Sequence, residues 1–498
     1  MKMPTPWLLA AMTCLGTVHQ TAGAEEARPH SAQVTENVQT LPARLSLGFE
    51  RVKLPADEKM GLLGGSYVFE LSPGWWLGPA VYGAASGRRG GLFTWGAEGQ
   101  RRWRLAERWE LTTGMYVGGG GGASAPVGGG LMLRPHADLM FDFGRWSTGL
   151  TVSHVRFPSG SIRSTQVGWQ VAVNDGFAFM APGHGGSTVK FDGVGGLGVD
   201  RISLVGGHYG SSSGYSSSLS HVGVRLEWVL DPVWSATAEA HGAASGGADG
   251  YAEMTGGALA LWSLPGDVVS LGGHAVLGLA GGGAVPTGGG TIAKLGVAGR
   301  LHLGRQFTLD AEAGRARSFG GGLDANYAQL SLGMALGTPR NGAAPAAERT
   351  VQDMEWELSL QDYLGAERKV GPSRNLGAIG LKFRRSLDPN FYLTGQAFSA
   401  ITGGAGAYSA GLVGLGATAR LGGGQAAWKW GAEALVGAAG GGGVASRGGA
   451  IVQPMAWIGR DLDRHNRIKL GAGYIKSIRG DLSSPVLDLT WAMAFGAP

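Results

Sequence analysis

The strongest constraint on the fold of this chain is an internal repeat that occurs three times. A glycine cluster recurs at intervals of 160 residues, around Gly128, Gly288 and Gly448. A turn motif of Leu, then Ser or Asp, then Pro, closed by an aromatic residue, recurs at 71–75, 230–234 and 387–391. A basic turn recurs at Arg145, Arg305 and His465. Ordered landmarks at one spacing predict a molecule built from three similar units.

Turn signals divide each unit into segments of roughly 10 to 16 residues, which suits β-strands that cross a bilayer at a tilt. In the first unit the expected strands are 44–54, 60–71, 75–86, 91–105, 109–122, 127–143, 146–157 and 165–174. Eight strands in each of three units predict an all-β fold. We expect a transmembrane antiparallel β-barrel of about 24 strands, an even number as in single-chain bacterial barrels.

The last segment of each unit alternates between apolar residues and small or polar ones. In the third unit Leu487, Leu489 and Trp491 share one face, and Asp488 and Thr490 share the other. This period of two is typical of a barrel strand with lipid outside and a polar interior. Applied to the last two segments of every unit, it predicts these lumen-facing residues: Ser147, Thr151, Ser153, Gln170, Thr308, Asp310, Glu312, Gln329, Lys469, Asp488 and Thr490.

The outward face of the penultimate segment ends in a basic residue in every unit, namely Arg156, Arg317 and Lys476. Long basic side chains at a membrane rim can reach the phosphates of lipid headgroups. We therefore expect these residues at the outer rim, in contact with water or with lipopolysaccharide.

The N-terminus has the features of a secretory signal peptide, with Lys2, an apolar run at 7–18 and small residues at 22–24. The single cysteine, Cys14, lies in that run, so the mature chain has no thiol. No later stretch reaches the ~20 apolar residues of a membrane helix. The expected organisation is a signal peptide at 1–24, a periplasmic segment at 25–43, repeats at 44–175, 201–335 and 356–498, and joints at 176–200 and 336–355.

A unit of eight strands is also the size of a complete small barrel, so two architectures are open. The joints are longer than hairpin turns, which favours three tethered eight-stranded barrels. However, an eight-stranded barrel must fill its interior with side chains. Many residues that the alternation assigns to the inward face, such as Ser147 and Gly149, are small. We favour one wide barrel around a water-filled lumen and keep three small barrels as the alternative.

Composition and motifs give no sign of a cofactor, a metal or a nucleic-acid partner. The net charge is only +5 and the basic residues are dispersed, so there is no basic stripe for nucleic acid. Among 93 glycines, chance matches to G-x-G-x-x-G are expected, and none is followed by Lys-Ser/Thr. Thiolate zinc sites need cysteines, which the mature chain lacks. The glycine clusters indicate loop tips or places where backbones approach closely.

Two stretches resemble known proteins. The final strand, with Phe495 near its end, resembles the C-terminal signal of porin-like bacterial outer-membrane proteins, which implies contact with the barrel-assembly machinery. Residues 153–160 are similar in placement to the His and Ser region of outer-membrane lipid A 3-O-deacylases. They depart from that family because Arg156 replaces the expected Ser, and His154 and Ser159 should point to opposite faces of a strand. We therefore assign no catalytic residue and expect no enzyme.

Together these features predict an outer-membrane channel, for small solutes or for polysaccharide export, with small and weakly charged lumen residues. The alternative is a structural or assembly component of an outer-membrane secretion or surface system. A lipid A acyl hydrolase is a third possibility. The sequence leaves the transported species and the oligomeric state open.

Overall fold

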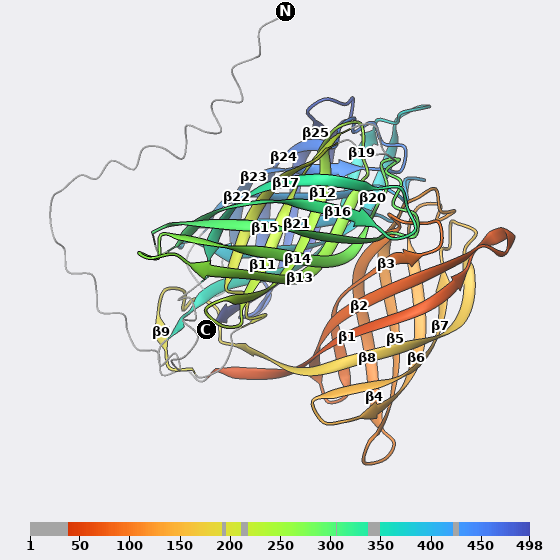
Figure 1. Cartoon of the computed structure of the whole chain (residues 1–498). Helices are drawn as coiled ribbons and strands as arrows, with labels where there is room; N and C mark the ends of the chain where they lie inside the picture. The colour runs from red at the N-terminus through yellow and green to blue at the C-terminus, as the bar shows by residue number, and fades with distance from the viewer. Residues whose placement is uncertain (1–37, 192–195, 211–217, 305, 337–348, 422–427) are drawn as a thin grey trace, which may run out of the picture.

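The computed structural model describes residues 38–191, 196–210, 218–304, 306–336, 349–421 and 428–498. These residues form three closed antiparallel barrels of eight strands each (Figure 1). The one helical element in these ranges is the short 3-10 turn η1 (Pro55–Asp57). In the same ranges, no helix has the length and apolar character needed to span a membrane.

Barrel 1 contains β1 (Gln39–Lys53), β2 (Lys59–Ser72), β3 (Trp75–Ser86), β4 (Phe93–Arg104), β5 (Trp109–Gly121), β6 (Met132–Asp142), β7 (Trp146–Arg156) and β8 (Arg163–Phe179). Barrel 2 contains β10 (Arg201–Tyr209), β11 (Leu219–Val229), β12 (Trp234–Ser245), β13 (Ala252–Ser263), β14 (Val269–Gly281), β15 (Thr291–Leu303), β16 (Phe307–Ser318) and β17 (Asp324–Ala335). Barrel 3 contains β19 (Gln352–Ala366), β20 (Arg374–Ser386), β21 (Phe391–Ala400), β22 (Ser409–Leu421), β23 (Trp428–Gly440), β24 (Ala450–Asp461), β25 (Asn466–Ser477) and β26 (Ser483–Ala497). Between the barrels, β9 (Thr188–Val189) pairs with β18 (Arg349–Thr350).

Each barrel closes by pairing its own first and last strands. In barrel 1, β1 pairs with β8 and places Leu45 opposite Val173. In barrel 3, β19 pairs with β26 and places Leu360 opposite Leu489. The prediction of three units of eight strands is confirmed. The preference for one wide wall is wrong, and the alternative of three tethered barrels is correct.

The predicted boundaries differ from the structure mainly at the joints. The signal peptide expected at 1–24 lies outside the described residues. β1 begins at Gln39, inside the segment expected to be periplasmic, and β8 runs to Phe179, inside the first joint. Beyond the barrel wall, residues 39–42 pair only with β8, so the two strands continue as a ribbon away from barrel 1 (Figure 1).

The two ends of each barrel carry different connections. In barrel 1, short turns at 73–74, 105–108 and 143–145 lie at one end, called here the turn end. Longer connections at 87–92 and 122–131 lie at the opposite end, called the loop end. The other two barrels follow the same order.

The recurring Asp-Pro motif forms turns as expected. The Asp231 carboxylate accepts hydrogen bonds from the amides of Val233 and Trp234, both at 2.8 Å. Asp388 accepts the equivalent bonds from Asn390 and Phe391 at 2.7 and 2.8 Å. The aspartate thus fixes the turn that starts the next strand.

The glycine clusters join the barrels at their loop ends. The amide of Gly90 in barrel 1 donates to the carbonyl of Gly288 in barrel 2 at 2.9 Å. The amide of Gly406 in barrel 3 donates to the carbonyl of Gly128 in barrel 1 at 3.1 Å. Barrels 2 and 3 meet in the same way, since a Cβ on Gly440 would lie 2.1 Å from the Gly250 nitrogen.

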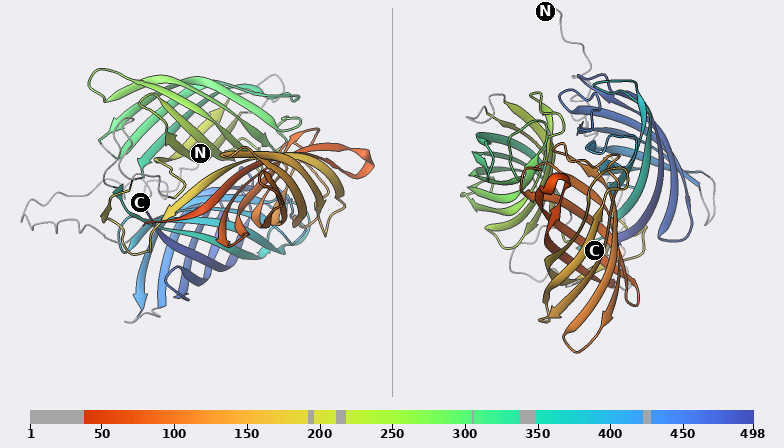
Figure 2. Two further views of the ribbon diagram at one scale, coloured as in Figure 1. Left: turned by 90° about the horizontal axis from the view of Figure 1, so that it is seen from below. Right: turned by 90° about the vertical axis from the view of Figure 1, so that its right-hand side faces the viewer.

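In each of these contacts a loop of one barrel meets the glycine cluster of the next barrel. Barrel 1 thus contacts barrel 2, barrel 2 contacts barrel 3 and barrel 3 contacts barrel 1, which gives a closed head-to-tail arrangement. The three barrels therefore lie around a common centre (Figure 2). At the turn ends, barrels 1 and 3 also share an aromatic cluster. Phe177 of barrel 1 contacts Trp356 and Phe495 of barrel 3, with ring centroids 5.1 and 5.2 Å apart.

Candidate functional site: the barrel interiors and the space between the barrels

The residues predicted to face the lumen lie in the interiors of three narrow barrels, not around one wide pore. Of the eleven, ten are buried and Gln170 is half-buried. Their neighbours include large charged and aromatic side chains that come from the strands not used in the prediction. These side chains form networks of hydrogen bonds and ion pairs inside each barrel.

In barrel 1 the network centres on Glu50. Arg134 donates to both oxygens of the Glu50 carboxylate, at 3.0 and 3.1 Å. The Ser153 hydroxyl also donates to Glu50, at 2.5 Å. Arg134 further donates to the Tyr82 hydroxyl at 3.1 Å, and Tyr82 donates to Glu98 at 2.9 Å. The buried charges are thus paired across the barrel, as burial requires.

In barrel 2 the network centres on Arg225, whose side chain is 0% exposed. Its guanidinium lies 2.6 Å from Glu239, 2.5 Å from Glu312 and 3.7 Å from Asp310. The ammonium of Lys294 donates to Glu239 at 3.2 Å. Each buried carboxylate therefore shares a cation with another one.

In barrel 3 the buried guanidinium of Arg384 forms ion pairs with Glu357, at 2.7 Å, and with Glu433. Nearer β26, the Lys382 ammonium donates to Asp488 at 2.7 Å. The charged residues Lys469 and Asp488, expected beside a water-filled lumen, are instead buried with partners of opposite charge.

The prediction of small and weakly charged interiors is therefore wrong. It rested on the last two strands of each unit, where small residues such as Ser147 do face inward. The remaining strands supply the volume and the charge that a narrow barrel needs. Toward the loop end of barrel 1 the filling becomes apolar, with buried Val52, Leu62, Tyr116 and Phe157 in one cluster. Barrels 2 and 3 have equivalent clusters.

Two groups of histidines and carboxylates in barrel 2 have side-chain atoms close enough to share a cation. They are His221 with His241 and Glu253, and Glu239 with His274 and Glu312. The sequence did not reveal them because their members are on different strands. Glu253 already accepts hydrogen bonds from Tyr209 and Tyr251, at 2.6 and 2.7 Å. We therefore interpret these groups as parts of the polar network inside barrel 2.

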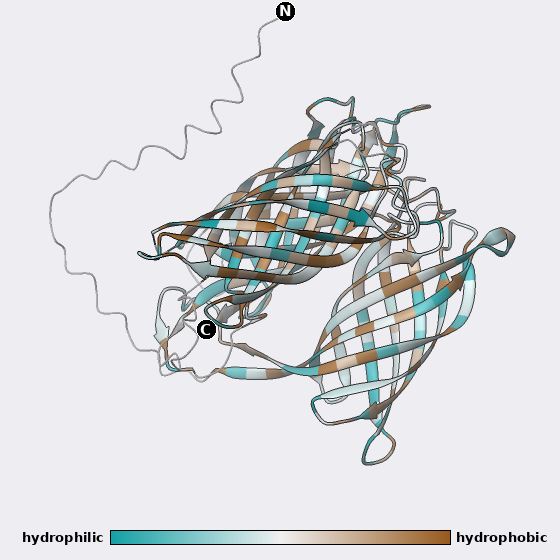
Figure 3. Cartoon of the chain, viewed as in Figure 1, coloured by the Kyte–Doolittle hydropathy of each residue, from teal (hydrophilic) through white to brown (hydrophobic). Residues whose placement is uncertain are grey.

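The barrel exteriors are apolar, and polar and apolar residues alternate along the strands (Figure 3). Tryptophans gather near the turn ends, where the exposed ones include Trp75, Trp103, Trp109, Trp146, Trp234, Trp262 and Trp428. Arg156, Arg317 and Lys476 are exposed at the loop ends. An apolar belt with an aromatic girdle has the chemistry of a surface immersed in lipid.

The stretch that resembles lipid A deacylases does not bring its histidine and serine together. His154 faces outward and its Nδ1 lies 2.8 Å from the Thr165 hydroxyl. Ser159 lies in the following loop, and its hydroxyl accepts a hydrogen bond from the Gly129 amide at 2.8 Å. The two side chains thus have separate partners.

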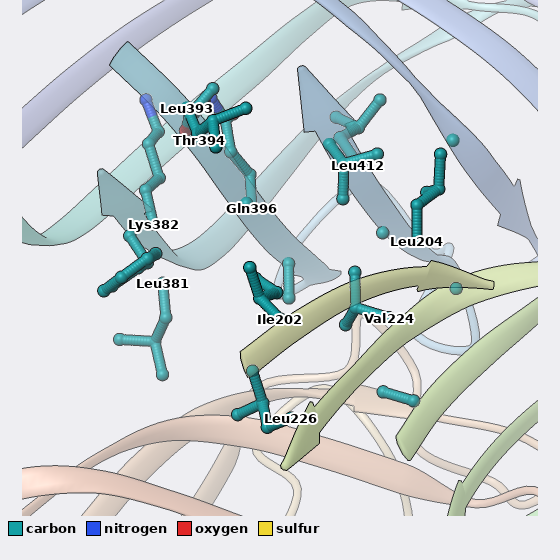
Figure 4. A pocket seen from close by; sticks show the side chains of 18 of the residues that line it. Ile202, Leu204, Val224, Leu226, Leu381, Lys382, Leu393, Thr394, Gln396 and Leu412 are labelled. Carbon is teal, nitrogen blue, oxygen red and sulfur yellow. Dashed lines mark hydrogen bonds between the residues drawn. The ribbon is translucent and has the colours of Figure 1, made fainter. Parts of the chain in front are cut away.

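A space of about 1660 Å³ lies between the three barrels and is lined by residues of all of them, most of which are apolar. Ile202, Leu204, Val224 and Leu226 form much of the barrel 2 side, opposite β20 to β22 of barrel 3 (Figure 4). Phe69 and Leu77 of barrel 1 also line the space. It reaches the glycines of the loop-end contacts, among them Gly91 and Gly250.

Each unit is a closed eight-stranded barrel. No protein-family model matches the chain, and no curated protein matches it. Among solved structures, Pseudomonas aeruginosa OccK5 aligns at 9% identity over 92% of this chain and 98% of its own, with a TM-score of 0.22. Acinetobacter baumannii OccAB3 aligns at 10% identity over 92% and 99%, with a TM-score of 0.21. A bacterial polysaccharide outer membrane secretin aligns at 6% identity over 91% and 97%, with a TM-score of 0.23. Values this low establish no common fold for the whole chain.

Proposed function

We propose that this chain is a bacterial outer-membrane protein that acts as a structural or assembly component, through the outer surfaces of three filled barrels. The observation that carries the proposal is the contrast between the two sides of each barrel wall. The interiors are occupied by paired charges and apolar clusters, whereas the exteriors expose many large apolar side chains.

The membrane location is supported by the closed strand pairing and by the exterior. Unpaired strand edges are strongly unfavourable in lipid, and a closed barrel has none. Outward residues at mid-barrel are large and apolar, for example Leu150 at 59% exposure and Val297 at 70%. In water such a surface would be unfavourable. With the predicted signal peptide and the C-terminal strand, this supports delivery to the outer membrane by the barrel-assembly machinery.

The structural role is supported by the way in which one chain fixes three barrels around a centre. A channel needs only one open barrel. The glycine contacts between barrels would contribute nothing to conduction through a pore. They do create a rigid membrane assembly whose loop ends present exposed bases, including Arg156 and Lys476. We expect these bases to contact the anionic groups of lipopolysaccharide.

A channel for small solutes is the second candidate, because each interior contains polar groups between the turn end and the apolar cluster. Conduction would require the cluster and ion pairs such as Glu50–Arg134 to open. Export of a polysaccharide would require a wider path than the described residues of any barrel provide.

Planar-bilayer recording on the full mature protein separates the two. The structural proposal predicts no conductance above that of bare lipid at moderate voltage. Steady conductance that changes when Lys382 is replaced by Gln would contradict it and favour the channel. A deletion strain provides the second test, since we expect normal solute permeability and a defect in a surface structure or in envelope integrity.

A further inference from the structure

Two buried cations, Lys382 and Arg385, line the space between the barrels. Lys382 faces into barrel 3, where it pairs with Asp488, whereas Arg385 faces outward. Arg385 is on β20, where the alternation turns Lys382 and Arg384 inward and Arg385 outward. Its side chain lines the inter-barrel space, and the residue is only 8% exposed. It lies at the turn end, next to the short hairpin between β20 and β21.

The partners of Arg385 do not neutralise its charge. Its Nη2 donates to the Gln352 side-chain oxygen at 2.9 Å, and its Nη1 lies 3.9 Å from the Met334 sulfur. Its Nε has no hydrogen-bond partner. Among the described residues, no carboxylate lies within ion-pair distance of it. The interior cations differ, since Arg225 and Arg384 each contact carboxylates.

A buried guanidinium without a counter-charge is strongly unfavourable, because burial removes its hydration and nothing replaces it. The missing partner should therefore be an anion that reaches the inter-barrel space. A guanidinium matches a phosphate well, because its planar N–H groups bind two phosphate oxygens at once.

The rest of the space indicates what is attached to that phosphate. Thr394 and Gln396 also line the space, but most of the wall is formed by apolar residues such as Ile202, Leu226 and Leu381 (Figure 4). The volume of about 1660 Å³ exceeds the roughly 300–1,000 Å³ of pockets for drug-sized ligands. An apolar space of this size with a cation at one end suits acyl chains with an anionic headgroup.

We propose that the inter-barrel space holds a glycerophospholipid, with its phosphate on Arg385 and its acyl chains along the apolar walls. The glycine contacts at the loop end keep the three barrels close enough to enclose the chains. This inference rests on the proposed membrane location, because the bilayer supplies the lipid.

The experiment measures phospholipid retained by the mature protein after extraction in mild detergent and extensive washing, by native mass spectrometry with lipid analysis. The wild-type protein should retain a phospholipid, and Arg385→Gln should lower its retention roughly tenfold, the loss of a charge-assisted contact. Arg385→Lys should keep part of it. Arg420→Gln is the matched control, since Arg420 is an exposed base near the turn end of the same barrel and does not line the space, and should retain as much as wild type.

Three outcomes would overturn the inference: equal retention by Arg385→Gln and wild type, retention of lipopolysaccharide in place of phospholipid, or displacement of the lipid by millimolar inorganic phosphate, which would indicate a free-phosphate site. Flotation of each variant with lipid vesicles tests the membrane location separately. A protein that floats but retains no phospholipid contradicts only this inference, whereas one that fails to float contradicts the proposed function.

Discussion

Removal of the central cation of barrel 2 should unfold that barrel far more readily than the other two. In Arg225→Met the aliphatic volume is largely kept, but Glu239, Glu312 and Asp310 lose the guanidinium that lies 2.6, 2.5 and 3.7 Å away. Breaking a buried ion pair by removing one partner costs about 3–5 kcal/mol, because the other charge stays buried and unpaired. Three carboxylates share this cation, so we expect the free energy of unfolding of barrel 2 to fall by an amount in the upper half of that range.

The assay is urea unfolding in lipid vesicles, followed by a dye on a single introduced cysteine. A dye at position 268, in a turn of barrel 2, reports on that barrel, and one at position 105 reports on barrel 1. The dye at position 268 should report a large decrease in the free energy of unfolding, and the dye at position 105 only a small one. Arg225→Met combined with Glu239→Gln should lose less than the sum of the single changes, since the two residues are in contact. A loss below about 1 kcal/mol at 268 would refute the view that paired charges fill the barrel.

Two further changes test the exterior and the contacts between barrels. Val297 lies at mid-barrel, faces outward and is 70% exposed. Val297→Arg should destabilise the protein in vesicles by about 2–4 kcal/mol, whereas Leu264→Arg in a turn should cost about 0–1 kcal/mol; equal costs would contradict immersion in lipid. Gly90→Val should separate barrels 1 and 2 without unfolding either, because a Cβ there would lie 2.6 Å from the Gly290 nitrogen. The Thr291 hydroxyl donates to the Ala85 carbonyl at 2.7 Å, so cysteines at these two positions should crosslink in the wild-type background and no longer do so in Gly90→Val. Gly206→Ala, with open space at its Cβ, is the control. Persistent crosslinking in Gly90→Val would argue against the contact.

Most strands could be predicted because their signals are local. The alternation through Leu487, Asp488 and Leu489 assigns the faces of β26 correctly, since a period of two depends only on neighbouring residues. The Asp-Pro turns at Asp231 and Asp388 likewise depend on side-chain to backbone bonds over two or three residues. The glycine clusters pointed to close backbone approach, although not to the barrel that each one meets.

The closure of the barrels could not be predicted from the same signals. A strand such as β8 presents the same two faces whether it pairs with β1 or with β10, so alternation does not choose its partner. The interior held the deciding clue. Glu50 and Arg134 face inward from strands far apart in the sequence, and their charge indicates a filled barrel only once all the strands are read together. Arg385 was missed because it follows two inward-facing bases and differs from them only by facing outward.

The closure of each unit on itself is the central claim, and cysteine crosslinking tests it directly. In a chain without Cys14, cysteines at Leu45 and Val173 should crosslink in the membrane, because these residues are opposite each other on β1 and β8. A pair at Leu360 and Leu489 should do the same in barrel 3. A pair at Leu45 and Leu489 should not react. Reaction of Leu45 with Leu489 or its neighbours on β26, without reaction with Val173, would show a single wide wall and contradict the three-barrel account.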